Sequence, residues 1–517
     1  VVATGIGLLA ALAGAQSVDE RAALRKLNQD ARAAHERKDY PAFLELTRRV
    51  VEKAPRSVGA LFNLACAQAL NGAKAEAIAT LDGLAKRGVA FDLTDSDLES
   101  LRGDPGFEVV ARRMAALEEP VGSSRVAFTL PDKTLITEGI AYDPKSGDFF
   151  VSSIRHRKIV RVSKDGRVSD FLSPGRDGLY SVVALDVDPA RRVLWASSDA
   201  SPRMEGFRKE DEGRSFVAEI DLETSQLHRR IDPPQLSPAA HLSDLAVGPA
   251  GDLAVADPYT GRLYLLPAGA EGLRVLVDVG PLASPQGIAW SPDGKSLFVA
   301  DYTQGIARVE VPAGTVRLLD VPKDAVVTGI DGLVWTDGSL VGIQNGVRPH
   351  RVSRFRLDSS LERVEEVTVL ERGQPSFDEP TLGVRVGAEL YYVANSQYRF
   401  VGDDGTLDLD RLQLPVILRA PLPWIGTKLR YDREYPAIGY SSAIPTDPVA
   451  RLRHRIEAGE ARLSFDPERG YLDSLLRELD ISKSSQVLVF TKTSLQKGRI
   501  SPQTPRAVYF GDDTYVA

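Results

Sequence analysis

Carboxylates recur just before four apolar, strand-like phrases of this sequence. Glu138 lies in TEGIAYD, Asp244 in LSDLAVG, Asp331 in GIDGLVW and Glu379 in DEPTLGV, while Gln286 in SPQGIAW holds the corresponding place in a fifth phrase. Carboxylates that converge on one axis repel one another unless a cation or shared protons lie between them. This pattern predicts a divalent-metal site, with calcium first and magnesium, manganese and zinc as alternatives. In the competing interpretation, these side chains hydrogen-bond the ends of neighbouring strands and enclose water.

Six near-copies of one short phrase position these residues. Each copy is a turn followed by an apolar strand that ends in a small or acidic residue, as in DPKSGDFFVSS and SPDGKSLFVAD. The turn positions fall about 43 to 59 residues apart, a period typical of radial β repeats; they are Gly147, Arg192, Gly251, Gly294, Gly338 and Gly387. The spacing predicts an all-β six-bladed propeller over residues 126–422.

Two further segments of the propeller region fall outside the six phrases. The strand-like segments 126–130 and 414–418 are each placed to complete a blade shared between the two ends, which would close the ring and remove exposed sheet edges. The charge-rich stretch 201–214 accounts for the longest interval between repeats. We interpret it as a solvated loop over one face of the disc.

The propeller region resembles the senescence-marker-protein/gluconolactonase (regucalcin-like) family over about 290 residues. Glu138-Gly139 and Asp331-Gly332 match two of the family's metal-site motifs. Two positions depart from the pattern, because Gln286 replaces the Asn of the remaining metal motif and Ser243 replaces the Asn of the substrate-holding Asn-Asp pair. An amide oxygen remains at the first position, whereas a hydroxyl makes a shorter and less directional contact at the second.

The resemblance implies metal-dependent hydrolysis of a lactone or a related sugar-derived ester. The implied metal ligands are Glu138, Gln286 and Asp331, and the implied proton acceptor is Asp331 or Asp244, with a metal-bound water as the nucleophile. Ser243 takes the substrate-binding position beside Asp244. The substitutions at Gln286 and Ser243 fall on residues that the family's chemistry uses.

Three other polar residues are candidate substrate contacts at the same mouth. His241 precedes Asp244 by three residues and is a second candidate base, Asn345 ends a repeated strand, and Glu379 opens the last phrase. The competing interpretations are a hydrogen-bonded surface His and a turn-forming Asn. The sequence contains no G-x-S-x-G, H-E-x-x-H or P-loop motif.

Residues 17–120 show an apolar period of 3.6, which predicts paired amphipathic helices. NLAC at 63–66, Gly72 and the later Ala77 and Leu81 resemble a tetratricopeptide hairpin. Residues 22–55 resemble a degenerate repeat before it, and 95–114 a closing helical element. Such helices either bind a peptide or protein partner in a groove or brace the neighbouring domain. Cys66 is predicted to be a small core residue.

Composition narrows the function classes. The 517 residues exceed what one core usually organises, and a net charge of −7 gives no general reason to bind nucleic acid. The apolar run 1–13 followed by Ala13-Gly14-Ala15 predicts a truncated export signal over 1–16, and a buried or frayed first helix is the alternative. One cysteine permits neither an internal disulfide nor a CxxCH haem site. We expect a periplasmic or secreted protein with no membrane span in its mature chain.

Residues 425–517 are predicted to form a small α+β module that continues beyond the sequence given. Helices are expected at 447–458 and 469–479, and strands at 486–491 and 507–516. SSQVLVFTKTSLQ and ISPQTPRAVYFGDDTYVA resemble an exported bacterial domain that precedes c-type cytochrome segments. A simple capping module is the alternative.

Two classes of function follow from these observations. The first is an exported small-molecule-binding propeller with a channel metal and lactone or ester hydrolase activity. The second is a non-catalytic periplasmic scaffold, in which the cation is structural and the helices or the propeller engage a partner. If a cytochrome segment follows, this scaffold is part of a redox-linked polypeptide. Mutation of Asp331 would abolish turnover in the first class and would chiefly lower stability in the second.

Overall fold

The computed structural model describes residues 18–422, 489–490 and 515–516. The chain forms two compact units, Val1–Leu422 and Pro423–Ala517. In the second unit, β25 (Val489–Phe490) pairs antiparallel with β26 (Tyr515–Val516), and both strands lie inside ranges predicted as strands. The two helices predicted there and the predicted export signal lie outside the described residues.

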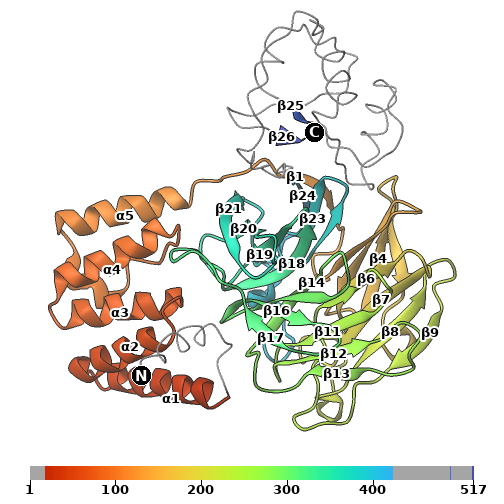
Figure 1. Cartoon of the computed structure of the whole chain (residues 1–517), viewed down its shortest axis with the longest axis horizontal. Coiled ribbons are helices and arrows are strands. Elements are labelled where there is room, and N and C mark those ends of the chain that lie inside the picture. The colour runs from red at the N-terminus through yellow and green to blue at the C-terminus, as the bar shows by residue number, and fades with distance from the viewer. Residues whose placement is uncertain (1–17, 423–488, 491–514, 517) are drawn as a thin grey trace, which may run out of the picture. The chain divides into compact units, whose positions relative to one another are not determined.

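The first unit begins with the predicted helical region (Figure 1). Its elements are α1 (Val18–Glu36), α2 (Tyr40–Lys53), α3 (Val58–Leu70), α4 (Lys74–Lys86), the 3₁₀ helix η1 (Ser96–Leu101) and α5 (Pro105–Leu117). Asp39, Ser57 and Asp104 cap α2, α3 and α5 by accepting hydrogen bonds from backbone N–H groups of the first turn. Helices pack as the pairs α1–α2 and α3–α4, and the tetratricopeptide identity stays a prediction.

The core of this region is apolar and contains Cys66. The thiol-bearing residue is 3% exposed and packs with Leu81, Leu84 and Phe107. Burial raises the pKa of the Cys66 thiol to about 12, so the reactive thiolate is scarce at neutral pH. This environment is consistent with the prediction that Cys66 is a small core residue.

In the described part of the chain, no helix combines the length and hydrophobicity that a membrane crossing requires.

Six four-stranded antiparallel sheets follow, which confirms the predicted six-bladed propeller. Blade 1 contains β2 (Ile140–Asp143), β3 (Asp148–Ser153), β4 (Lys158–Val162) and β5 (Val168–Leu172). Blade 2 contains β6 (Ser181–Asp188), β7 (Val193–Asp199), β8 (Ser215–Asp221) and β9 (Leu227–Ile231). Blade 3 contains β10 (Leu245–Val247), β11 (Leu253–Asp257), β12 (Arg262–Leu266) and β13 (Arg274–Val277).

The second half of the propeller repeats this order. Blade 4 contains β14 (Pro285–Trp290), β15 (Ser296–Asp301), β16 (Gly305–Glu310) and β17 (Val316–Leu318). Blade 5 contains β18 (Ile330–Thr336), β19 (Ser339–Gln344), β20 (Arg351–Leu357) and β21 (Val364–Arg372). Blade 6 contains β22 (Gly383–Val386), β23 (Glu389–Val393), β24 (Val416–Pro421) and β1 (Arg125–Thr129).

Blade 6 closes the ring with strands from both ends of the propeller sequence. β1 pairs antiparallel with β24, so that Arg125 lies opposite Arg419 and Thr129 lies opposite Val416. The sheet order is β1-β24-β23-β22, with the earliest strand at one edge. The two segments predicted to complete a shared blade therefore both do so, which ties the ring shut without a disulfide.

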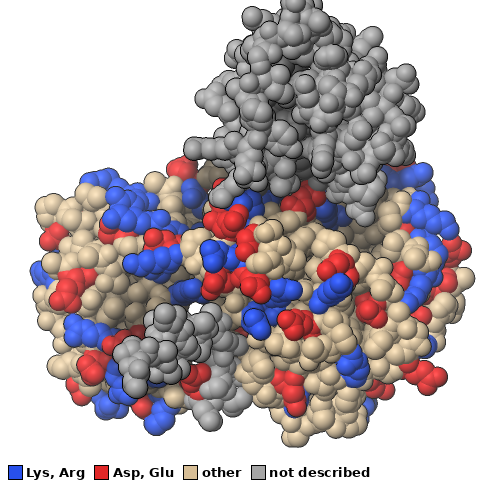
Figure 2. Space-filling view, viewed as in Figure 1, with Lys and Arg blue, Asp and Glu red and all other residues tan. Residues whose placement is uncertain are grey.

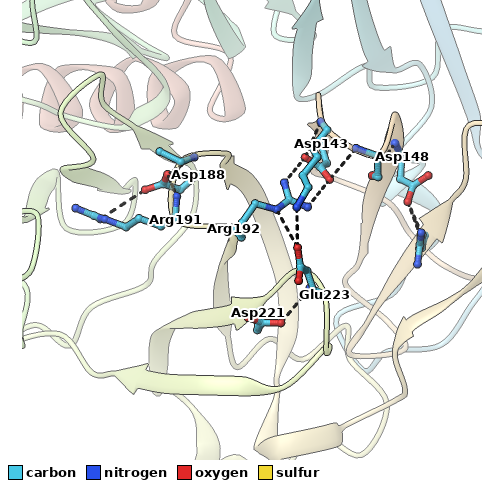
Figure 3. A network of polar contacts seen from close by, with 11 residues as sticks. Asp143, Asp148, Asp188, Arg191, Arg192, Asp221 and Glu223 are labelled. Atoms are coloured by element: carbon cyan, nitrogen blue, oxygen red, sulfur yellow. Dashed lines mark hydrogen bonds and ion pairs between the residues drawn. The ribbon is translucent and has the colours of Figure 1, made fainter.

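The turn between β6 and β7 carries Arg192 where the other five repeats have Gly, and the Arg192 side chain belongs to an ion-pair network (Figure 3). Arg192 lies between β6 and β7 with φ +60°, a left-handed conformation that favours Gly. Its guanidinium donates two hydrogen bonds to the Asp143 carboxylate, at 2.6 and 2.8 Å, and lies 3.7 Å from Glu223. Because Asp143 ends β2, these contacts join blades 1 and 2.

The helical region contacts the loop between β19 and β20. The Ala90 N–H donates a 2.8 Å hydrogen bond to the Arg348 carbonyl oxygen, and the buried Arg351 side chain donates one of 2.6 Å to the Gly88 carbonyl oxygen. The same loop begins at Asn345, a predicted substrate contact.

Lys and Arg intermingle with Asp and Glu over the face shown in Figure 2.

Candidate functional site

In blades 1, 4 and 5, the strand that lines the channel carries a polar residue followed by Gly. The polar-Gly motif places Glu138, Gln286 and Asp331 at equivalent positions, each two residues before an apolar residue that pairs with the second strand of its blade: Ile140 with Val151, Ile288 with Val299 and Leu333 with Gly342. The pairing is irregular at Gln286 and at Asp331, where the first strand carries extra residues. Such bulges re-aim side chains, and here they lie at two of the three predicted ligands.

The glycines let neighbouring blades approach closely at this level. A Cβ atom on Gly139 would lie 2.6 Å from the Val183 carbonyl oxygen, and one on Gly287 would lie 2.4 Å from the Leu333 nitrogen. A Cβ atom on Gly332 would lie 2.6 Å from the Thr381 carbonyl oxygen. Real Cβ atoms do not tolerate such distances, so the close backbone packing between neighbouring blades requires Gly at these three positions.

Glu138 is the most buried of the predicted ligands. The residue is 9% exposed, its backbone carbonyl accepts a 2.9 Å hydrogen bond from Thr381 Oγ1, and its carboxyl group shares a hydrogen bond with Tyr398. Its Oε2 atom is buried and makes no hydrogen bond within the described residues. Burial, followed by repulsion from Asp331, raises the pKa of Glu138 well above its usual value.

Asp331 is held by a relay of two polar side chains. Asn345 Nδ2 donates a 2.7 Å hydrogen bond to Asp331 Oδ2, and Tyr302 Oη donates one of 2.9 Å to Asn345 Oδ1. Burial, opposed by the hydrogen bond from Asn345 and reinforced by repulsion from Glu379, raises the pKa of Asp331 to about 6. Asn345 therefore contacts a predicted ligand directly.

Gln286 is half-buried, and its amide oxygen is the candidate ligand at the position equivalent to Glu138 and Asp331. The structure places Ser243, also half-buried, at the same position of blade 3, two residues before Leu245, which pairs with Val255.

Asp244 lies one residue further along than this ring of equivalent positions. Its two carboxylate oxygens accept 2.9 Å hydrogen bonds from the backbone N–H groups of Leu245 and of Ile288 in blade 4. Burial raises the pKa of Asp244 to about 8. Its carboxyl group thus joins two blades, an arrangement that matches the strand-bracing interpretation rather than that of a base with a free oxygen.

Asp186 repeats the same arrangement between blades 2 and 3. Its oxygens accept 2.8 Å hydrogen bonds from the N–H groups of Val187 and Val247, and burial raises its pKa to about 6. Asp186 and Asp244 both line a cavity of about 320 Å³ in the channel, together with Trp290 and Trp335. Asp186 follows no repeated polar-Gly motif, so the sequence offered no signal for it.

His241 and Glu379 each have protein partners. His241 Nδ1 lies 3.3 Å from Asp199 Oδ1, and its ring packs against Tyr259 with centroids 4.7 Å apart. The hydrogen bond with Asp199 raises the pKa of His241. Glu379 adopts φ +58°, accepts a 3.1 Å hydrogen bond from the Arg399 N–H, and adds repulsion to Glu138 and Asp331.

Three aromatic or basic residues complete this side of the channel, and none was predicted from the sequence. Tyr302 and Tyr398 contact Asn345 and Glu138, and the Arg203 guanidinium lies over the Tyr398 ring, 5.2 Å from its centroid. Tyr398 opens a one-turn 3₁₀ helix after Gln397, which has φ +63°. These residues lie on loops outside the repeated phrases, where periodicity carries no information.

Residues 136–370 match the protein family described as the SMP-30/Gluconolactonase/LRE-like region. The match contains all three polar-Gly motifs at Glu138, Gln286 and Asp331. The propeller region is therefore similar to this family over the matched residues. The match begins two residues before Glu138 and ends within β21, so the helical region and the second compact unit lie outside it.

Several solved structures are similar to this propeller. A gluconolactonase from Xanthomonas campestris is 19% identical with a TM-score of 0.42, and the match covers 60% of this chain and 93% of that one. The calcium-binding protein regucalcin from Agrobacterium tumefaciens is 18% identical with a TM-score of 0.40, covering 57% and 95%. Virginiamycin B lyase from Staphylococcus aureus is 14% identical with a TM-score of 0.39, covering 52% and 81%. No curated protein matches the sequence significantly.

The predicted donor set of Glu138, Gln286 and Asp331 fits a hard divalent cation in its chemistry. Across residues 18–422 and the two short strands, no three His, Cys, Asp or Glu side chains gather closely enough to hold a metal by themselves. The predicted set needs fewer acids, because it combines two carboxylates with the Gln286 amide. The buried, unbonded Glu138 Oε2 is the kind of acceptor that a cation would satisfy.

Proposed function

We propose that this protein is an exported small-molecule-binding propeller with a divalent cation, calcium first, at the channel mouth, and that it hydrolyses a lactone or a related sugar-derived ester. The observation that carries the proposal is the buried Glu138 Oε2, which makes no hydrogen bond within the described residues and is repelled by Asp331. A buried acceptor in this state is costly unless a donor, a proton or a cation satisfies it.

Glu138, Gln286 and Asp331 would hold the cation. When bound, it would polarise the ester carbonyl and acidify a water molecule. Asn345 engages Asp331 Oδ2, which leaves Oδ1 as the oxygen that accepts the proton from water. Ser243, before the first strand of blade 3, and Glu379, before the first strand of blade 6, are the proposed contacts for substrate hydroxyl groups. Asp244 is less suited to proton transfer, because both of its oxygens hold backbone N–H groups.

A non-catalytic scaffold is the second candidate, and a specific observation favours it. Two groups predicted to act on substrate are engaged in protein contacts, Asp244 with two blades and His241 with Asp199. In this candidate the cation stabilises the ring, and the helical region engages a peptide or protein partner. A link to a cytochrome segment belongs to the same candidate.

The test is a divalent-metal titration of the purified protein, read as melting temperature. Wild type, Glu138→Gln and Asp331→Asn are compared with Glu389→Gln, whose side chain is more than a third exposed on the same propeller. We expect calcium to stabilise wild type and Glu389→Gln but neither mouth variant. A panel of sugar lactones then separates the two candidates, because only the hydrolase loses turnover in Asp331→Asn. The absence of any metal-dependent shift in wild type would overturn the metal site.

A further inference from the structure

The channel continues beyond the polar-Gly motifs toward the opposite end of the propeller. Glu138, Gln286 and Asp331 lie within two residues of the start of a first strand, whereas the cavity of about 320 Å³ is lined mainly by later residues of the first strands and by the turns that follow them. Its lining includes Pro249 and Pro292, which are exposed in the turns of blades 3 and 4. The cavity therefore opens on the face that carries these turns, away from the proposed metal ligands.

Apolar side chains dominate the lining of this cavity. They come from the first strands of all six blades and include Leu185, Val247 and Val384, with Trp290 and Trp335 near the ends of β14 and β18. A mostly apolar pocket of about 300 Å³ or more, in which a few polar groups converge, is the usual form of a small-molecule site.

Three charged side chains also line the cavity, and its two acids have no cationic partner. Asp244 is 8% exposed, and neither Asp186 nor Asp244 makes an ion pair within the described residues. Arg385 is not their counter-ion, because its guanidinium donates a 2.9 Å hydrogen bond to the Gly387 carbonyl oxygen and lies 3.4 Å from Asp337 Oδ1. A buried, ionised carboxylate is costly without an opposite charge.

Repulsion between acids adds to this cost. Burial, opposed by the two backbone hydrogen bonds and reinforced by repulsion from Asp186 and Asp331, raises the pKa of Asp244 to about 8. A cation in the cavity would stabilise both carboxylates that line it. It need not displace the backbone N–H groups that they hold, because each carboxylate oxygen has a second lone pair.

The chemistry of the lining favours an organic cation over other occupants. A hard metal ion requires about six or more oxygen ligands, which an apolar cavity with two acids does not supply. A polyol would leave most of its hydroxyl groups against hydrocarbon. An ammonium group with alkyl substituents suits the cavity, because its charge pairs with the acids, its alkyl groups contact the aliphatic lining, and indole rings attract cations.

We propose that this cavity is a second ligand site and that it binds a small organic cation of the quaternary ammonium class. The charge of the cation lies beside Asp186 and Asp244, and its alkyl groups pack against the apolar lining. This site lies away from Glu138, Gln286 and Asp331, so it depends neither on the proposed metal nor on hydrolysis.

The test is calorimetric binding of choline and of 3,3-dimethylbutan-1-ol to the full chain. The second probe is the neutral analogue of choline in which carbon replaces the quaternary nitrogen. A buffer of about pH 8.5 keeps both carboxyls largely ionised, because their pKa values are about 6 for Asp186 and about 8 for Asp244. Wild type should bind choline at least about tenfold more tightly than the alcohol.

Asp186→Asn and Asp244→Asn should each weaken choline binding by at least about tenfold and leave binding of the alcohol unchanged. The matched control is Asp293→Asn. Asp293 is exposed in the turn after Pro292 and does not line the cavity, and hydrogen bonds from the Ser291 hydroxyl and the Lys295 N–H lower its pKa, so it is a charged acid beside the site. The choline affinity of this control should equal that of wild type.

Equal affinities of wild type for choline and the alcohol would overturn this second site, and this comparison needs no variant. Equal losses for both probes in Asp186→Asn and Asp244→Asn would also overturn it, with the melting temperature of each variant reporting on its fold. The choline titration is repeated with calcium and with Glu138→Gln. Displacement of choline by calcium, or loss of choline binding in Glu138→Gln, would assign the cation to the proposed metal ligands instead. Choline binding that neither change affects supports the second site, whether or not calcium binds.

Discussion

Asn345 donates a 2.7 Å hydrogen bond to Asp331 from the far end of the strand that pairs with β18. The two residues meet because Ile330 and Gln344 face each other at the end of the β18–β19 hairpin, while the bulge at Asp331 turns its side chain to Asn345. Tyr302, from the preceding blade, orients the Asn345 amide through a 2.9 Å hydrogen bond to its oxygen. Two blades thereby fix one carboxylate.

Removal of this support should weaken metal binding without unfolding the propeller. Asn345→Ala is expected to lower calcium affinity by about 10- to 100-fold, because partners that orient a ligand contribute about this much. Tyr302→Phe should have a smaller effect, since it removes only the hydrogen bond that orients the Asn345 amide and leaves the bond from Asn345 to Asp331 in place. Calcium affinity measured by calorimetry tests this order, with the 75%-exposed Tyr259 changed to Phe as control. A Tyr302→Phe effect as large as that of Asn345→Ala would contradict the relay.

The glycines of the polar-Gly motifs should tolerate no side chain. Gly287→Ala would place a Cβ 2.4 Å from the Leu333 nitrogen and 2.6 Å from the Asp331 carbonyl oxygen, so blades 4 and 5 must separate. We expect a loss of about 1–3 kcal/mol in the free energy of unfolding. The control is Gly272→Ala, where no atom lies within 4 Å of the added Cβ. Denaturant unfolding measures both variants, and equal stability of the two would show that the blades are less tightly packed than described.

The Arg192–Asp143 pair should contribute to stability at neutral pH and lose this contribution in acid. Burial opposes ionisation of Asp143, but hydrogen bonds from Arg192 and from the Lys145 and Ser146 N–H groups together hold its pKa well below its usual range. A folded pKa below the unfolded value gives stability that is present above about pH 4 and lost as the pH falls further. The Asp143 side chain is only 2% exposed, so Arg192→Ala should cost about 1–3 kcal/mol at pH 7.

The matched control for this pair is Lys145→Ala. Lys145 contacts Glu223 in the same network, but both side chains are at least 60% exposed, so the expected cost is below about 1 kcal/mol. Urea unfolding at pH 7 and at pH 3 measures both variants. The difference between Arg192→Ala and wild type should shrink at the lower pH. A constant difference would mean that Arg192 acts through packing and not through the Asp143 charge.

The buried carboxyl of Asp244 predicts the opposite pH dependence. Its folded pKa of about 8 lies above the value of about 3.9 for an unfolded chain, so the folded protein binds more protons between these limits. Its contribution to stability is full below about pH 4 and is lost as the pH rises through 8. With a chelator present, the melting temperature of wild type should therefore fall from pH 5 to pH 9.

Asp244→Asn should flatten this fall, because an amide does not titrate in the range. The difference in slope between wild type and variant is expected to reach at most about 1.4 kcal/mol per pH unit. Asn also presents an NH₂ group where Ile288 needs an acceptor, so the variant should be less stable at every pH. Parallel pH profiles for the two proteins would show that Asp244 keeps its charge in the folded state.

The sequence alone determined the number of blades and the closure of the ring. Apolar strands and turn residues recur with a period that local propensity and hydrophobic alternation impose, so six phrases and two end segments predicted six sheets and a shared blade. The same local reasoning placed Glu138, Gln286 and Asp331 on equivalent strands, because each precedes a Gly and an apolar run. The amphipathic period predicted the N-terminal helices for the same reason.

Only the tertiary structure decided how each polar group is used. Asp244 lies one residue from the position of Gln286, and this shift directs its carboxylate to backbone N–H groups of two blades. Arg203 lies on a loop with no periodic pattern, yet docking on blades 1 and 6 brings it over Tyr398. Periodicity reports which face of a strand is buried, whereas bulges, loop docking and distant partners depend on contacts between residues far apart in the chain.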